Sequence, residues 1–208
     1  MRLSVSILNS KDKINMIKTL NNTKISYIHI DVMDGLFVSQ KSLPSNEIIK
    51  LSPFSSKPLD IHLMVENPMY YIERIKELQN IDNITIHLEI NKDIKNILNK
   101  IKEYGFKRSL AIKPNTNINL LVPYLDIIDR ILIMTVEPGL GGQPFLENSP
   151  NRIKEIKKLI KDKNIELEVD GGINNQTINK VKDVDISVVG SYITTSDNPA
   201  QRINDLLV

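Results

Sequence analysis

Short apolar segments typical of β-strands alternate with segments of helical periodicity eight times along this 208-residue chain. No Ser-, Gly- or Pro-rich linker separates these segments. Eight strand–helix units close a (β/α)8 barrel, a fold of roughly 200 to over 400 residues. We therefore expect an α/β protein in which residues 1–208 form a single (β/α)8 TIM barrel; an open, doubly wound sheet is the alternative. The expected strands are residues 3–8, 25–31, 59–64, 84–88, 108–112, 131–135, 166–169 and 186–189.

Capping residues indicate where several helices begin and end. Ser10 is placed to cap the first helix, and Asn67 with Pro68 supplies an N-cap and a first-turn proline to the third. Gly105 follows the fourth helix, where a left-handed residue is favoured. The expected helices run from Ser10 to about residue 20, and then over about residues 45–51, 68–79, 92–104, 118–124, 150–161, 176–181 and from 199 onward.

Charge and cysteine content exclude several classes of function. The 27 basic and 25 acidic residues leave a net charge of +2, which gives no reason to expect a nucleic-acid or membrane partner. The chain has no cysteine, so disulfides, thiolate catalysis and cysteine-based metal sites are excluded. The amino terminus enters a strand pattern at once, and no apolar run is long enough to span a bilayer. We expect a cytoplasmic enzyme.

Imidazoles and carboxylates stand where three of the expected strands end. His29 and Asp31 are two residues apart and therefore lie on one face of a strand. His62 ends the next strand about thirty residues on, and Asp170 ends the seventh. Parallel strands of a barrel point the same way, so these side chains should converge on one point. Two imidazoles and two carboxylates suit one divalent ion, Zn²⁺, Fe²⁺, Mn²⁺ or Co²⁺.

Other polar residues near strand ends receive supporting roles. His87 ends the fourth strand with Glu89 two residues on, and we expect a supporting or core role for this histidine. Asp60 stands two residues before His62, and we expect it to orient that imidazole. Lys113 could form a Schiff base in principle, but we expect a solvated lysine at the rim of the barrel.

Six of the eight glycines follow the last three strands. Glycine allows backbone amides to approach an anion without an intervening side chain, and barrel enzymes often bind phosphate after strands 7 and 8. Each glycine alone is explained by an ordinary turn, whereas the clustering favours a phosphate site. The six are Gly139, Gly141, Gly142, Gly171, Gly172 and Gly190.

Five motifs resemble, in order and spacing over nearly the whole chain, those of the ribulose-phosphate 3-epimerase family. They are His-Ile-Asp-Val-Met-Asp-Gly at 29–35, Asp-Ile-His-Leu-Met-Val at 60–65, Val-Glu-Pro-Gly-Leu-Gly-Gly-Gln at 136–143, Glu-Val-Asp-Gly-Gly-Ile at 168–173 and Val-Gly-Ser at 189–191. The resemblance implies a barrel of the ribulose-phosphate-binding type. It also implies a metal-dependent isomerase of the pentose phosphate pathway that interconverts D-ribulose 5-phosphate and D-xylulose 5-phosphate.

The resemblance assigns roles to individual residues. His29, Asp31, His62 and Asp170 would bind the metal, and Asp31 with Asp170 would be the catalytic acid/base pair. Met33, Met64 and Met134 end three strands and would shield the intermediate, although core filling also explains them. The substrate would be bound by Ser6, His62, Gly139, Leu140, Gly141, Gly142, Asp170, Gly171, Gly172, Gly190 and Ser191.

The chemistry of inversion agrees with this assignment. The carbonyl of a 2-ketose acidifies the C3 proton, and two carboxylates on opposite faces can remove and return it through a metal-stabilised enediolate. Two alternatives are a 3-epimerase of a six-carbon ketose phosphate such as allulose 6-phosphate, and a non-catalytic phosphosugar-binding barrel. We also expect a homo-oligomer.

One loop departs from the family pattern. Residues 35–40 read Gly-Leu-Phe-Val-Ser-Gln, where the family typically reads Gly-His-Phe-Val-Pro-Asn. Leu36 therefore stands where the family has an imidazole, beside the expected metal site, so substrate fit or rate could differ.

Overall fold

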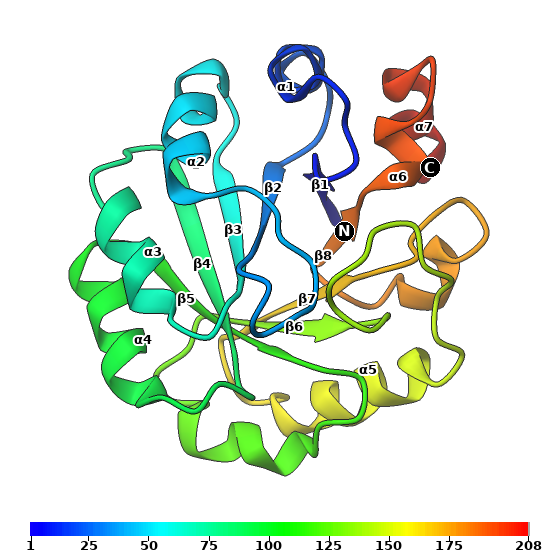
Figure 1. Cartoon of the computed structure of the whole chain (residues 1–208). Coiled ribbons are helices and arrows are strands. Elements are labelled where there is room, and N and C mark those ends of the chain that lie inside the picture. Colours follow the sequence, from blue (N-terminus) through cyan, green and yellow to red (C-terminus); the bar gives the residue numbers. More distant parts are fainter. Residues whose placement is uncertain (208) are drawn as a thin grey trace.

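Eight parallel strands close into a barrel in sequential order, from β1 next to β2 round to β8 next to β1. The computed structural model describes residues 1–207, and Figure 1 shows the helices forming a ring outside the strands. The closed parallel barrel confirms the expected fold and excludes the open sheet. The strands are β1 (Arg2–Ser6), β2 (Tyr27–Met33), β3 (Leu59–Met64), β4 (Ile81–His87), β5 (Lys107–Ile112), β6 (Arg130–Met134), β7 (Glu166–Asp170) and β8 (Ile186–Val189).

Two of the expected α-helices are short 3₁₀-helices instead. In η2 (Ile118–Tyr124), Pro123 lacks the backbone N–H that an α-helix would use, and η3 (Ile178–Val181) is a single short turn. A further helix, α6, was not expected and follows β8 directly. The α-helices are α1 (Lys13–Asn21), α2 (Ser45–Leu51), α3 (Pro68–Ile75), α4 (Ile94–Glu103), α5 (Ser149–Leu159), α6 (Ser191–Thr194) and α7 (Pro199–Leu206), with a 3₁₀ turn η1 (Ser52–Phe54) after α2.

The caps agree with the sequence at one helix and differ at another. Gly105 has φ +89°, the left-handed residue expected after α4. The N-cap of α1 is Asp12, not Ser10, because the Asp12 carboxylate accepts the N–H of Asn15. Ser10 lies two residues earlier and donates its hydroxyl to the carbonyl of Asp12. Within residues 1–207, none of the helices combines the length and apolar character needed to cross a bilayer.

The two faces of each strand enter different environments. On β2, Ile28, Ile30 and Val32 belong to the large apolar cluster between the strands and the helices. His29 and Asp31 alternate with them and face the barrel interior, where both are buried. The apolar core of this protein is therefore the layer outside the barrel, while much of the interior is polar.

Arg130 is the centre of the polar interior at the amino-terminal end of the strands. Its side chain is fully buried and lies 3.1 Å from Asp60, 3.2 Å from Glu168 and 3.0 Å from Glu166. Burial acts to lower the pKa of Arg130, but these carboxylates outweigh it and raise that pKa above its ordinary value. Burial raises the pKa of Glu168 well above its ordinary value, and the nearby Asp60 adds to the effect. Arg130 thus balances the charge of buried acids.

Replacing Arg130 should destabilise the whole barrel. We expect Arg130→Met to lower the free energy of unfolding by about 3–5 kcal/mol, because removing one partner of a buried ion pair leaves an uncompensated charge. Urea denaturation followed by circular dichroism measures the loss. Lys100→Met, which removes an exposed pair with Glu103, is the control and should have little effect. Equal losses in the two variants would contradict this account of the interior.

Candidate active site

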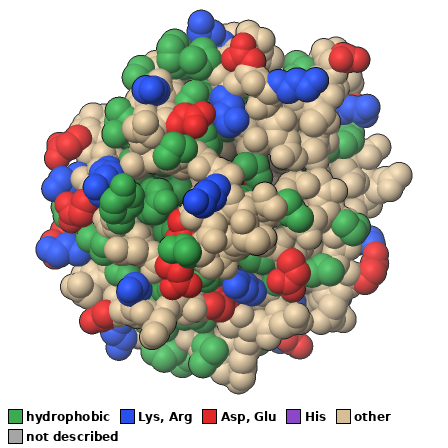
Figure 2. Space-filling model, viewed as in Figure 1, with side chains coloured by type: hydrophobic (Ala, Val, Ile, Leu, Met, Phe, Trp, Pro, Cys, Tyr) green, Lys and Arg blue, Asp and Glu red, His purple; other side chains and the backbone are tan. Residues whose placement is uncertain are grey.

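Strand register brings the four expected ligands together at one end of the barrel. Asp31 on β2 is directly beside His62 on β3. His29 lies two residues before Asp31 on β2 and faces the same side of the strand. Asp170 is the last residue of β7. One ligand atom from each of the four lies within 4.8 Å of the others. All three histidines are fully buried, and Figure 2 accordingly shows none on this face.

The facing atoms form a compact set of nitrogen and oxygen donors. His62 Nδ1 is 3.2 Å from Asp31 Oδ1 and 3.6 Å from Asp170 Oδ2. His29 Nε2 is 3.4 Å from Asp31 Oδ1, is buried, and makes no hydrogen bond. A buried imidazole nitrogen without a partner is costly unless it binds something. These residues therefore fit a divalent metal ion, as the donor types also suggest.

His29 is held by Asp60 through its other nitrogen. Nδ1 of His29 is 2.8 Å from Asp60 Oδ2, and Asp60 also accepts hydrogen bonds from Ser4 and Asn83. The expectation that Asp60 orients His62 is wrong. Residues 60 and 62 share a strand face but lie about 6–7 Å apart along it, whereas the register places Asp60 directly beside His29.

His62 is held instead by His87, as the supporting role expected for His87 implies. Their Nε2 atoms are 2.9 Å apart, and His87 Nδ1 is 3.1 Å from Glu89 Oε2. Burial lowers the pKa of His87 to about 4. Burial acts to raise the pKa of Glu89, but hydrogen bonds from His87, Thr116 and the Lys113 backbone outweigh it and lower that pKa to about 2. Lys113 itself lies at the rim over the ring of Phe37.

The two carboxylates have pKa values displaced in opposite directions. Burial disfavours the charged form of Asp31, but His29 and His62 outweigh it and hold the pKa of Asp31 well below its ordinary value. Burial, reinforced by the charge of Asp31, raises the pKa of Asp170 to about 6. Ser6 donates its hydroxyl to Asp31 Oδ2 at 2.6 Å. The two carboxylates are thus favoured in different protonation states, with Asp31 ionised and Asp170 keeping its proton to a higher pH.

A cavity of about 330 Å³ opens above this pair of carboxylates. His62, expected among the substrate contacts, is not part of its wall and lies buried behind it. In Figure 1 the loop after β2 and the loop after β6 cross the middle of the ring of helices. The expected residues that line the cavity are Ser6, Asp31, Met33, Met64, Met134, Gly139, Leu140, Gly141, Gly142, Asp170, Gly171, Gly172, Gly190 and Ser191.

Several residues that line the cavity were not expected from the sequence. Asn9 lies against Gly141, where an added Cβ would fall 2.3 Å from the Asn9 amide nitrogen. Asn174 directly follows the Asp-Gly-Gly-Ile motif, and its polar side chain after a strand was a usable signal. Tyr192 and Thr195 lie on and after α6, and they were missed because that helix was not expected.

Leu36, the departure from the family pattern, points away from the site. Its side chain is 77% exposed and does not line the cavity. The carboxylate of Asp34 holds this loop by accepting the N–H groups of Leu36, Phe37 and Glu66. The loop therefore closes beside the site without an imidazole at position 36.

Gly172 has the tightest contact with the backbone of another segment among the glycines of the cavity. Gly172 has φ +68°, and an added Cβ would fall 2.5 Å from the backbone nitrogen of Phe145. Gly105 has a similar φ of +89° but open space where its Cβ would be. The two positions share the conformational requirement and differ only in the close approach.

This pair of glycines gives a matched test. We expect Gly105→Ala to lower the free energy of unfolding by about 1–2 kcal/mol, the cost of a left-handed alanine. Gly172→Ala should cost more, because the backbone at Phe145 must also move. Urea denaturation of both variants measures the difference. The account of the close contact is wrong if the two alanines cost the same.

Known proteins resemble this chain over nearly its whole length. The model of the "Ribulose-phosphate 3 epimerase family" matches residues 2–194. Ribulose-phosphate 3-epimerase of Bacillus subtilis is 32% identical over 197 residues, which cover 92% of this chain and 90% of that protein. The protein of the same name from Helicobacter pylori strain J99 is 34% identical over 211 residues, covering 99% and 96%.

Solved structures support the fold alone. The tryptophan synthase alpha-subunit of Pyrococcus furiosus superposes with a TM-score of 0.75 at 15% identity, covering 99% of this chain and 96% of that one. The 3-hexulose-6-phosphate synthase of Salmonella typhimurium gives 0.66 at 16% identity, covering 99% and 96%. The family model and the relatives' identities, over nearly the whole length, decide the assignment. This chain belongs to the ribulose-phosphate 3-epimerase family.

Proposed function

We propose that this enzyme interconverts D-ribulose 5-phosphate and D-xylulose 5-phosphate: one of Asp31 and Asp170 removes the C3 proton from one face, and the other delivers a proton to C3 from the opposite face. The observation that carries the proposal is the pair of carboxylates that line the cavity, buried Asp31 and half-buried Asp170, with oppositely displaced pKa values. The names of the Bacillus and Helicobacter relatives support this substrate pair.

The two carboxylates exchange roles between the two directions of the reaction. In one direction ionised Asp31 removes the C3 proton from one face, and protonated Asp170 returns a proton to the other face. The product direction uses the opposite assignment, so each carboxylate must hold and release a proton. Ser6 donates its hydroxyl to Asp31 Oδ2 and so keeps the other oxygen of that carboxylate directed toward the centre of the site.

A divalent ion would be held by His29 Nε2, Asp31 Oδ1, His62 Nδ1 and Asp170 Oδ2. Such an ion supplies positive charge that stabilises the oxygens of an enediolate. In its absence, Asp31 and Asp60 outweigh burial and raise the pKa of His29 well above its ordinary value. Binding of a cation at Nε2 would therefore displace a proton from His29.

The substrate phosphate is bound by backbone groups. Throughout the part of the chain that the structure describes, the cavity wall contains no Lys or Arg. It contains instead the glycines after β6, β7 and β8 together with the hydroxyl of Ser191, and such loops can direct several amides at one anion. Gly142 lies against the Ser191 hydroxyl, so these two loops meet at the proposed phosphate site.

Three methionines cover the reacting end of the cavity. Met33 on β2 is directly paired with Met64 on β3. Met134 on β6 is paired with Asp170 on β7. All three are buried, line the cavity, and offer no exchangeable proton. They would keep water from the intermediate while leaving proton transfer to the carboxylates.

Removing either carboxylate charge should abolish epimerisation. We expect Asp31→Asn and Asp170→Asn each to lower kcat by at least about 10²-fold, the lower range for general acid–base catalysis, while circular dichroism shows the fold retained. Transfer of the C3 hydrogen of ribulose 5-phosphate to D₂O, followed by NMR, measures the chemical step. Asp126→Asn, which changes an exposed carboxylate outside the cavity wall, is the control. Substantial activity in either site variant would overturn the two-carboxylate mechanism.

Metal removal should give the same loss reversibly. Chelation of the wild-type enzyme should stop both C3 exchange and xylulose 5-phosphate formation, and adding Zn²⁺, Fe²⁺, Mn²⁺ or Co²⁺ should restore them. Allulose 6-phosphate, tested in parallel, decides between five- and six-carbon substrates. Folded, metal-loaded protein that exchanges neither sugar would leave phosphosugar binding without catalysis as the function.

A further inference from the structure

His87 lies against His62, with their Nε2 atoms 2.9 Å apart. We propose that His87 and Glu89 are positioning residues that fix the proton of His62 on Nε2 and so leave His62 Nδ1 free to bind a cation. This inference rests on the metal site of the proposed function. It assigns a role to His87 and Glu89, which neither line the cavity nor belong to the candidate set of metal ligands.

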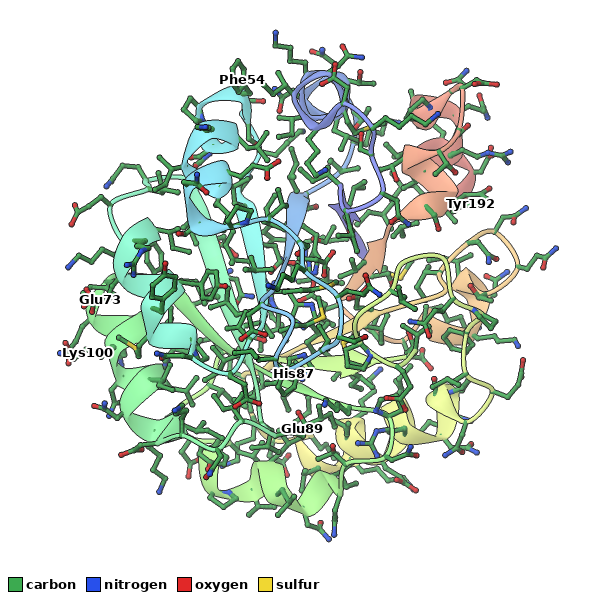
Figure 3. All side chains as sticks on the ribbon, in the orientation of Figure 1. Phe54, Glu73, His87, Glu89, Lys100 and Tyr192 are labelled. Carbon is green, nitrogen blue, oxygen red and sulfur yellow. The ribbon has the colours of Figure 1, made fainter. Side chains whose placement is uncertain are left out.

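The hydrogen-bonded series His62–His87–Glu89 runs from the centre of the barrel outward. His62 Nε2 lies 2.9 Å from His87 Nε2, with ring centroids 5.0 Å apart and ring planes inclined by 26°, so the two nitrogens meet across the ring edges. His87 Nδ1 lies 3.1 Å from Glu89 Oε2. Figure 3 shows His87 near the middle of the barrel and Glu89 beyond it toward the edge.

Counting protons along this chain leaves one arrangement compatible with metal binding. A carboxylate only accepts hydrogen bonds, so His87 must donate to Glu89 from Nδ1. Neutral His87 then accepts at Nε2, and the proton between the two rings belongs to His62 Nε2. A neutral His62 with its proton there has a lone pair at Nδ1, the atom that faces Asp31 and Asp170.

The opposite arrangement would close the site. If His87 carried its proton on Nε2, His62 would have to accept at Nε2 and hold its own proton on Nδ1. That proton would point at the two carboxylates and occupy the place of the cation. The orientation of the hydrogen bond between the two histidines therefore decides whether His62 can be a ligand.

Glu89 is itself fixed, so it cannot turn away from His87. Its Oε1 accepts the backbone N–H of Lys113 at 2.7 Å and the hydroxyl of Thr116, both from the segment after β5. Arg152 in turn donates to the carbonyls of Lys113 and Thr116. One carboxylate oxygen is thus anchored by this segment, and the other is left for His87.

The surroundings of His87 exclude a competing partner. His87 is fully buried, and the ring of Phe37 packs against it with centroids 4.7 Å apart. The Lys113 ammonium lies 4.0 Å from the centroid of Phe37. The hydrogen-bond partners of the two His87 nitrogens are therefore His62 and Glu89.

The variant Glu89→Gln tests the proposal, because replacing one oxygen by an NH₂ group should reverse the direction of the hydrogen bonds along this series. Glu89→Gln keeps the carbonyl oxygen for Lys113 and Thr116 but presents an NH₂ group to His87 Nδ1, which should force the His87 proton onto Nε2. We expect Co²⁺ affinity of the full-length, metal-stripped protein, measured by calorimetry, to fall 10–100-fold, as for other partners of metal-binding histidines. In the Zn²⁺-loaded wild type, ¹⁵N NMR should place the His87 proton on Nδ1, and in Glu89→Gln on Nε2.

Two comparisons separate this role from a structural one. Thr116→Val removes one of the two anchors of Glu89 but keeps the Lys113 N–H and the carboxylate itself, so it should lower Co²⁺ affinity less than Glu89→Gln does. His87→Gln can still accept from His62 Nε2 through its amide oxygen and should retain more affinity than His87→Leu, which offers no acceptor.

Four results would contradict the proposed role of His87 and Glu89. It is overturned by unchanged Co²⁺ affinity in Glu89→Gln, by an equal loss in Thr116→Val, by a His87 proton on Nε2 in the wild type, or by a wild type that binds neither ion. None of these measurements uses a sugar. C3 exchange in the wild type tests the proposed function separately, so the two can fail independently.

Discussion

The interior of a closed barrel cannot be reached by bulk water, so every polar group that faces inward must find its partner there. This protein satisfies that requirement with charge. Arg130 enters the interior from the start of β6 and contacts Asp60 and Glu168 on β3 and β7. Because Asp60 also bonds His29 of the candidate metal-ligand set, the buried ion pairs at the base of the barrel and the candidate site at its mouth form one continuous network.

Both candidate histidine ligands are supported by carboxylates, His29 through one hydrogen bond and His62 through two. His29 reaches Asp60 directly, whereas His62 reaches Glu89 only through His87. In each case one ring nitrogen is engaged away from the site and the other is directed toward Asp31 and Asp170. The ring orientations are thus set before any ligand enters, which is the condition for a metal site whose geometry does not depend on the substrate.

The carboxyl ends of the strands separate two tasks. Strands β2, β3 and β7 carry the titrating and donor side chains, while the loops after β6, β7 and β8 contribute mainly backbone and small residues to the cavity. Position 36 belongs to neither group, since Leu36 projects into solvent. The departure of this chain from the family pattern therefore leaves both the donor set and the glycine loops unchanged, and Asp34 holds the altered loop in place.

The sequence by itself determined the eight-unit barrel and the convergence of His29, Asp31, His62 and Asp170 at one end, because strand period and parallel direction follow from local pattern. It did not determine which residue supports which. The partner of Asp60, the buried position of Arg130 and the contact between His62 and His87 depend on the stagger between neighbouring strands, a property of the closed barrel rather than of any one segment. Only the tertiary structure decides that stagger, since it is set by how all eight strands and their outer helices pack at once.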